Sequence, residues 1–136
     1  MALLTAVVLS ACKPAATEPV FEEAWIRSLP PGMKMTAGFG ILKNETAQDV
    51  EFTAFSSPAF SDVSLHETVV IDGVNKMQKV DSLTVASGES VELAPGGYHL
   101  MLVMPRASIY PGRTVPVEFT AADGRTFTYD VSVERR

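Results

Sequence analysis

GGYHLMLVMP, residues 96–105, is the stretch of the sequence that decides the fold. In an extended strand, residues two positions apart point to the same face. His99 and Met101 therefore share one face, which we expect to be the outer face or the rim of a sheet. The opposite, core-facing set would consist of Tyr98, Leu100 and Leu102. The segment predicts a β-strand with one packed face and an imidazole–thioether pair on the other.

The rest of the chain from Val20 onward has the pattern of an all-β protein. Turn pairs such as Asp-Gly, Pro-Gly and Ser-Gly recur about every 8–12 positions, which is typical of β-sandwiches and barrels. Several segments between the turns alternate with period two, and in QDVEFTAFSS we expect Val50, Phe52 and Ala54 on one face. We therefore predict an all-β fold, a single antiparallel β-sandwich of about eight or nine short strands.

Composition and charge exclude several classes of protein. The 136 residues are enough for one domain, and 46% of them are apolar, which suits a packed core. The net charge of −5 and the scattered basic residues argue against a nucleic-acid partner. The only cysteine is Cys12, so no intrachain disulfide can form. Neither histidine has a Ser–Asp arrangement at catalytic-triad spacing, and we expect the protein not to be an enzyme.

Residues 1–12 resemble a secretory signal peptide that ends in a lipobox. The apolar run is too short to span a bilayer as a helix. Leu9-Ser10-Ala11-Cys12 resembles the bacterial sequence in which the cysteine is lipidated and becomes the mature N-terminus. The alternative is an ordinary cleaved signal with a chance cysteine. We expect residues 13–19 to be a linker, residues 20–136 to form the domain, and the protein to be a periplasmic lipoprotein anchored to the membrane at Cys12.

Four nitrogen and sulfur donors stand outside the apolar stripes of their segments. His66 is out of step with its apolar neighbours in SLHETV, Met77 stands among polar residues in NKMQKV, and His99 and Met101 are the pair described above. Thioether sulfur is a soft ligand that suits Cu(I), whereas zinc sites use thiolate, imidazole or carboxylate. Taken singly, such a histidine is usually a satisfied structural residue and such a methionine usually fills the core. The coincidence of all four favours a copper site.

The spacing of these donors is H-x10-M-x21-H-x-M, which resembles the signature of the PCu(A)C family of periplasmic copper chaperones. Further segments resemble blocks of that family, and the resemblance covers roughly residues 20–134. These segments are AWIRSLPPG (24–32), LHE (65–67), LAPGGYHLML (93–102) and YPGRTVPVEF (110–119). Two features depart from the family pattern. Glu67 stands where some members have a second methionine, and many relatives lack a lipid anchor.

The resemblance implies a cupredoxin-like β-sandwich that binds one Cu(I) through His66, Met77, His99 and Met101, with binding of Cu(II) left open. It also implies a metallochaperone that delivers copper toward the dinuclear copper centre of cytochrome c oxidase. The implied partners are subunit II of that oxidase and a Sco-type thiol protein.

Two other functions stay open from the sequence. One is a metal-free interaction lipoprotein. The other is a cupredoxin-type electron carrier, which would need a cysteine thiolate that the sequence lacks beyond Cys12.

The sequence allows two roles for each of several further side chains. Met33 and Met35 form a second Met-x-Met pair, which could be a docking or secondary metal site or simply solvent-facing loop residues. Met104 has the core parity of its strand, so we expect it in the core or at the rim, with an auxiliary ligand role as the alternative. Trp25 and Phe60 could shield the ion, but packing is the role that we favour.

Overall fold

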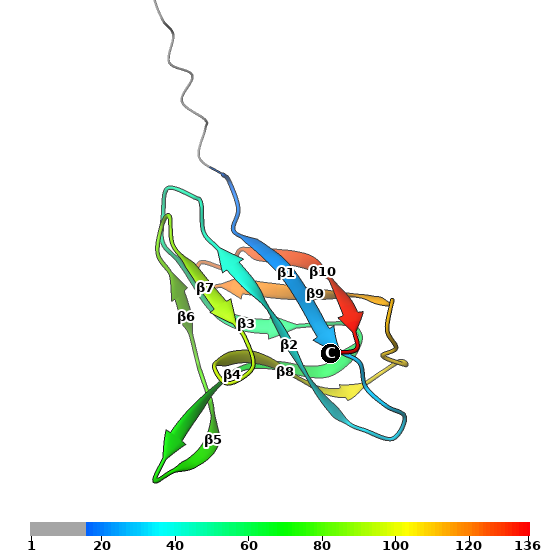
Figure 1. The fold of residues 1–136 in the computed structure, drawn as a ribbon. Helices are drawn as coiled ribbons and strands as arrows, with labels where there is room; N and C mark the ends of the chain where they lie inside the picture. Colours follow the sequence, from blue (N-terminus) through cyan, green and yellow to red (C-terminus); the bar gives the residue numbers. More distant parts are fainter. Residues whose placement is uncertain (1–15) are drawn as a thin grey trace, which may run out of the picture.

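The structure, a computed structural model, describes residues 16–136 (Figure 1). The proposed signal peptide and lipobox, residues 1–12, lie outside the described residues, and the first strand begins at Val20. All regular elements in the described part are strands, and no helix there is long and apolar enough to cross a membrane. The strands are β1 (Val20–Arg27), β2 (Met35–Lys43), β3 (Val50–Ser56), β4 (Phe60–Ile71), β5 (Val74–Lys79), β6 (Leu83–Val85), β7 (Ser90–Leu93), β8 (Tyr98–Pro105), β9 (Thr114–Ala121) and β10 (Thr126–Glu134).

The ten strands of the described chain form one sheet in the order β5-β4-β8-β7-β2-β1-β10-β9-β3-β6. A short pairing of Phe55 in β3 with Val63 in β4 closes this sheet on itself, and β8 also pairs directly with β2. The prediction of an all-β fold is confirmed, with ten strands where about eight or nine were expected. The ladders are antiparallel except for two parallel pairings, β1 with β10 and β7 with β8. The alternation of residues within a single segment does not show which strands pair in parallel.

The core fills the inside of the closed sheet. Leu100 and Leu102 of β8 are buried and Tyr98 is half-buried against the core, as the alternation predicted. Phe60 at the start of β4 also belongs to this core, so its role is packing. Complete burial of each such aliphatic or aromatic side chain contributes about 1.5–3 kcal/mol. The side chains inside the sheet therefore stabilise it, and residues on its outer face are available for binding.

One predicted core position is wrong. Ala54 was expected to share a face with Val50 and Phe52, but it is exposed, whereas Phe55 packs against the core. The ladder between β3 and β9 shifts register between Phe52 and Ala54, as at a β-bulge. One extra residue in a strand reverses the alternation beyond it, and this explains why the period-two reading failed at that point.

The β4–β5 hairpin extends from the closed sheet, and its end projects away from the other strands (Figure 1). Its turn is Asp72-Gly73, and both residues have positive φ, 51° and 76°, as the tight turn of a two-residue hairpin requires. All six residues of β5 are exposed. The hairpin is therefore held mainly by its backbone ladder, and it carries Met77 outside the core.

Candidate metal centre

The four candidate donors lie on one face of neighbouring strands. In the antiparallel β4–β8 ladder, His66 pairs with His99, and Ser64 pairs with Met101. Met77 of β5 pairs with Thr68, which has the same parity in β4 as His66. Directly paired residues in an antiparallel ladder point to the same side of the sheet. The intervening Leu65 and Leu100 are buried in the core, so the donors occupy the opposite, outer face.

A cavity of about 420 Å³ opens on this face, and three of the four predicted ligands line it. They are Met77, His99 and Met101. His66 is not among the lining residues but lies directly beside the cavity, because its ring stacks on that of His99 with centroids 6.0 Å apart. The structure thus brings residues from β4, β5 and β8 together.

His99 is held in place by the turn that precedes it. Its side chain is only 5% exposed, and its Nδ1–H donates a hydrogen bond of 3.2 Å to the carbonyl oxygen of Gly97. The same oxygen accepts the backbone N–H of Thr68 at 3.1 Å, which ties the turn to β4. Gly96 has a φ of 88°, a conformation that favours glycine. Because a carbonyl only accepts, Nδ1 carries a proton, and in the neutral form of the ring Nε2 has a free lone pair.

His66 is oriented by a side chain on its own strand. Its Nε2 lies 2.9 Å from Ser64 Oγ, and its Nδ1 has no partner. Burial lowers the pKa of His66, and the neighbouring His99 and Lys79 lower it further, because each disfavours a second positive charge. The neutral imidazole is therefore the favoured form, and it is also the form that binds a metal ion.

Two ring nitrogens stand out in the hydrogen-bond pattern of residues 16–136. Nδ1 of His66 and Nε2 of His99 are the buried side-chain nitrogen or oxygen atoms in that range without a partner. Buried polar atoms are normally satisfied, so each such exception needs an explanation. A metal ion would supply the missing partner to both. The thioethers of Met77 and Met101 add soft, neutral donors, and such a set fits Cu(I) better than a hard cation.

Sequence reasoning missed Phe39 of β2, which is 4% exposed and lines the cavity. Met33 and Met35, whose role the sequence left open between a docking or secondary metal site and plain loop residues, line it as well. Their positions follow from the pairing of Ala37 with Met101, which the sequence does not reveal. Met104 does not line the cavity and is exposed, so its core placement is not observed.

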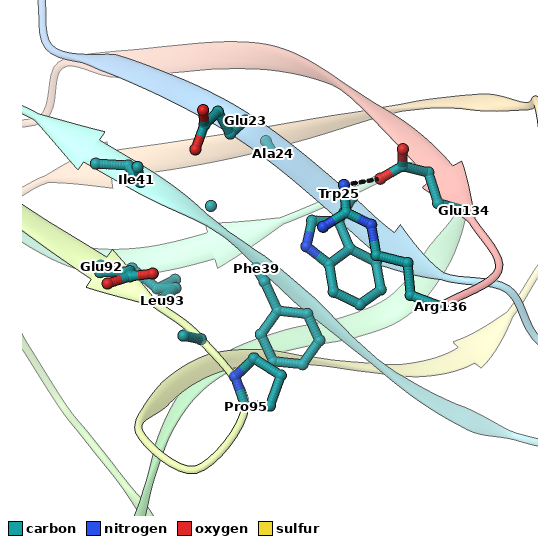
Figure 2. Close-up of a pocket in the computed structure, with 12 residues that line it drawn as sticks. Glu23, Ala24, Trp25, Phe39, Ile41, Glu92, Leu93, Pro95, Glu134 and Arg136 are labelled. Atoms are coloured by element: carbon teal, nitrogen blue, oxygen red, sulfur yellow. Dashed lines mark ion pairs between the residues drawn. The ribbon is translucent and has the colours of Figure 1, made fainter.

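Figure 2 shows the residues that line a second cavity, of about 650 Å³. Phe39 and Pro95 line both cavities. Trp25 lies in this second cavity rather than in the donor cavity, and its ring packs on Phe39 with centroids 4.8 Å apart. Arg136 lies over the Trp25 ring at 4.5 Å and forms an ion pair of 3.0 Å with Glu134. Trp25 therefore packs in a wall beside the donors and does not cover them.

Comparison with known proteins identifies the relatives of this chain. A family model described as "Putative lipoprotein LpqE-like" matches residues 20–133, nearly the whole described part. The chain belongs to the LpqE-like family. The LpqE-like protein is 34% identical over 113 residues to "Putative lipoprotein Lxx21020" of Leifsonia xyli subsp. xyli, covering 82% of this chain and 67% of that relative. It is also 27% identical over 124 residues to the uncharacterized protein RP573 of Rickettsia prowazekii, covering 88% and 68%.

Solved structures agree with this placement. The LpqE-like chain superposes on the copper-bound PCuAC domain from PmoF2 with a TM-score of 0.71 and 19% identity, covering 91% of this chain and 97% of that one. It superposes on the solution structure of CuI-DR1885 from Deinococcus radiodurans with a TM-score of 0.69 and 27% identity, covering 90% and 81%. The predicted resemblance to the PCu(A)C family and the cupredoxin-like fold are thereby confirmed.

Proposed function

We propose that this LpqE-like protein is an extracytoplasmic carrier of Cu(I) and that His66, Met77, His99 and Met101 hold the ion. The observation that carries the proposal is the pair of unpartnered, buried ring nitrogens on adjoining strands beside a methionine-lined cavity. Copper in the similar PCuAC domain from PmoF2 and Cu(I) in the similar DR1885 structure support the choice of metal. Copper is the cargo here, and the protein binds and releases it without chemical conversion.

The donor set explains how an ion can be both held and released. Two neutral imidazoles and two thioethers leave the site with the single positive charge of Cu(I), so little charge is buried. Thioethers are weak donors, and a receiving protein can replace them one at a time. Met77 is 62% exposed, so its sulfur is the donor most open to such exchange. We propose no enzymatic activity for this arrangement.

The destination and the anchoring of the carrier are further parts of the proposal. We propose delivery toward the dinuclear copper centre of cytochrome c oxidase, with subunit II or a Sco-type thiol protein as receiver. The lipoprotein names of the family and of the Leifsonia relative support lipid attachment at Cys12. We propose a periplasmic location together with that attachment.

Titration of the purified protein with Cu(I) in competition with bicinchoninate tests the proposal. We expect one equivalent of Cu(I), and we expect His99→Ala and Met101→Ala to lose it. Met104→Leu is the control, because Met104 is exposed and does not line the cavity. Copper should also raise the melting temperature, since a ligand at about a thousand times its Kd adds about 4 kcal/mol of stability. If Cu(I) neither binds nor protects the fold from heat, the metal-free interaction lipoprotein becomes the better interpretation.

A colour measurement on the same sample separates the carrier from an electron-transfer protein. The only cysteine is Cys12, and blue copper sites need a thiolate in their coordination plane. The copper complex should therefore be colourless, whereas an intense blue band would reverse the assignment.

A further inference from the structure

The methionines of this protein are placed in an unusual way. Five of them lie in residues 16–136, and none of the five belongs to the buried core. Methionine normally fills irregular gaps in cores. Here four of the five line one cavity instead, together with His99. They are Met33, Met35, Met77 and Met101. Two of these four have no part in the proposed ligand set.

The register of β2 places Met35 next to the proposed ligands. Ala37 pairs directly with Met101, and Met35 pairs with Val103 two positions further along β8. Met35 and Met101 are therefore diagonal neighbours on the same side of the sheet. Such neighbours lie about 7–8 Å apart, which long side chains can span. Met35 is 53% exposed, so its thioether is at the open side of the cavity.

The loop before β2 holds Met33 beside the same cavity. The backbone N–H of Met33 donates to the carbonyl oxygen of Pro30 at 3.2 Å, and that of Met104 donates to the carbonyl oxygen of Lys34 at 2.7 Å. The backbone on both sides of Met33 is thus fixed, while its side chain remains 57% exposed. Because its backbone is anchored and its thioether is exposed, the side chain of Met33 can change position while it donates to a metal ion.

We propose that Met33 and Met35 form a transfer station for Cu(I) at the mouth of the donor cavity, a proposal that rests on the proposed function. Each transfer step breaks one bond from copper to nitrogen or sulfur and forms one new bond from copper to sulfur. Copper stays monovalent throughout, and no proton or electron has to move. The second thioether pair lets the ion leave His99 and Met101 without entering water before it reaches the receiving protein.

Methyl NMR with Ag(I), a redox-stable substitute for Cu(I), tests the station directly. The methionine methyl groups would be labelled in the wild type and in His99→Ala, in which the proposed main site is disrupted. We expect the Met33 and Met35 signals to shift in both proteins, whereas the Met104 signal stays in place. The signals of Met77 and Met101 could shift in the wild type while those of Met33 and Met35 shift in neither protein. That result would overturn the transfer station but leave the proposed carrier function intact. If no methionine signal shifts in the wild type, the proposed carrier function is wrong as well.

Transfer kinetics supply a second readout. The double variant Met33→Leu/Met35→Leu keeps similar side-chain volumes at two exposed positions, so it should fold normally. We expect its release of Cu(I) to bathocuproine disulfonate to slow by about tenfold, which corresponds to about 1.4 kcal/mol in the barrier. The affinity for Cu(I) should change less than this rate. Met104→Leu is the matched control with an unchanged rate, and a double variant as fast as the wild type would overturn the proposal.

Discussion

His66 and His99 face each other across the β4–β8 ladder, with ring centroids 6.0 Å apart and ring planes inclined by 24°. Each ring has one nitrogen in a hydrogen bond and the other buried without a partner. The partner of His66 is the hydroxyl of Ser64 on the same strand, and the partner of His99 is the carbonyl oxygen of Gly97 in the turn before β8. The two imidazoles are thus oriented by hydrogen bonds within the protein alone.

Ser64→Ala should weaken Cu(I) binding without removing a ligand. Ser64 Oγ lies 2.9 Å from Nε2 of His66 and positions that ring. Loss of a partner that orients a metal-binding histidine typically costs about 10–100-fold in affinity. Competition with bicinchoninate measures the change. Ser61→Ala is the matched control, because Ser61 is an exposed serine on the same strand. Equal affinities for the two variants would contradict a positioning role for Ser64.

The copper-free protein should lose stability as the pH falls below about 6.5, the ordinary pKa of histidine. Burial lowers the pKa of His66 in the folded state, so the unfolded chain takes up its proton first. The stability from a neutral His66 is therefore complete above the unfolded pKa and is lost as the pH falls through the lower, folded pKa. Urea unfolding at several pH values measures this loss. His66→Gln should have a flatter profile, and an unchanged profile would show that another group is responsible.

Cu(I) binding should weaken below about pH 6, because imidazole must be neutral to bind a metal ion. The lowered pKa of His66 should let its contribution persist to lower pH than that of an ordinary histidine. The apparent Kd measured between neutral and acidic pH checks this. An affinity that stays flat down to about pH 4 would rule out ligation by two histidines.

Met77→Leu should weaken Cu(I) binding but leave the fold nearly untouched. Met77 is 62% exposed, and every other residue of β5 is exposed as well. Exposed substitutions usually change the free energy of unfolding by less than about 0.5 kcal/mol. Titration with copper and thermal unfolding, measured side by side, separate the two effects. Met104→Leu, at another exposed methionine, should change neither, and a Met77→Leu protein with full affinity would remove Met77 from the ligand set.

Leu100→Ala should destabilise the protein strongly. Leu100 stands between His99 and Met101 in β8, and its side chain is 1% exposed inside the core. Truncation of such a leucine costs about 2–5 kcal/mol, because it leaves a cavity. Leu100→Met keeps the volume and should cost less than about 1.5 kcal/mol. Urea unfolding compares the two variants, and equal stabilities would contradict the core assignment of this strand face.

Strand alternation was sufficient to predict much of the site. Because side chains in a strand alternate strictly, the sequence predicted that His99 and Met101 share a face opposite Leu100, and the structure agrees. The same rule failed at Ala54, where a bulge adds one residue to β3. A bulge depends on the pairing with the partner strand, so it cannot be predicted from the sequence of β3 alone.

The approach of β2 to β8 at the donor cavity could not be predicted from the alternation of residues within either strand. The places of Phe39 and Met35 beside Met101 depend on the pairing of β2 with β8, whose residues are more than sixty positions apart in the sequence. The spacing of the four donors pointed to the site only because it resembles a known signature. The sequence singled out Met33 but left its role open, because its place at the cavity depends on a hydrogen bond between its loop and β8.

The β4–β5 hairpin would let the proposed copper site open without global unfolding. β5 pairs with β4 through a backbone ladder from Lys79 to Val74, and none of its side chains is buried. Segments with few buried contacts open locally at a small fraction of the global unfolding free energy. Withdrawal of Met77 would break ladder hydrogen bonds but expose no core surface. Amide hydrogens of β5 should therefore exchange with solvent much faster than those of β8, and release of the proposed copper cargo would require only a local fluctuation of this hairpin.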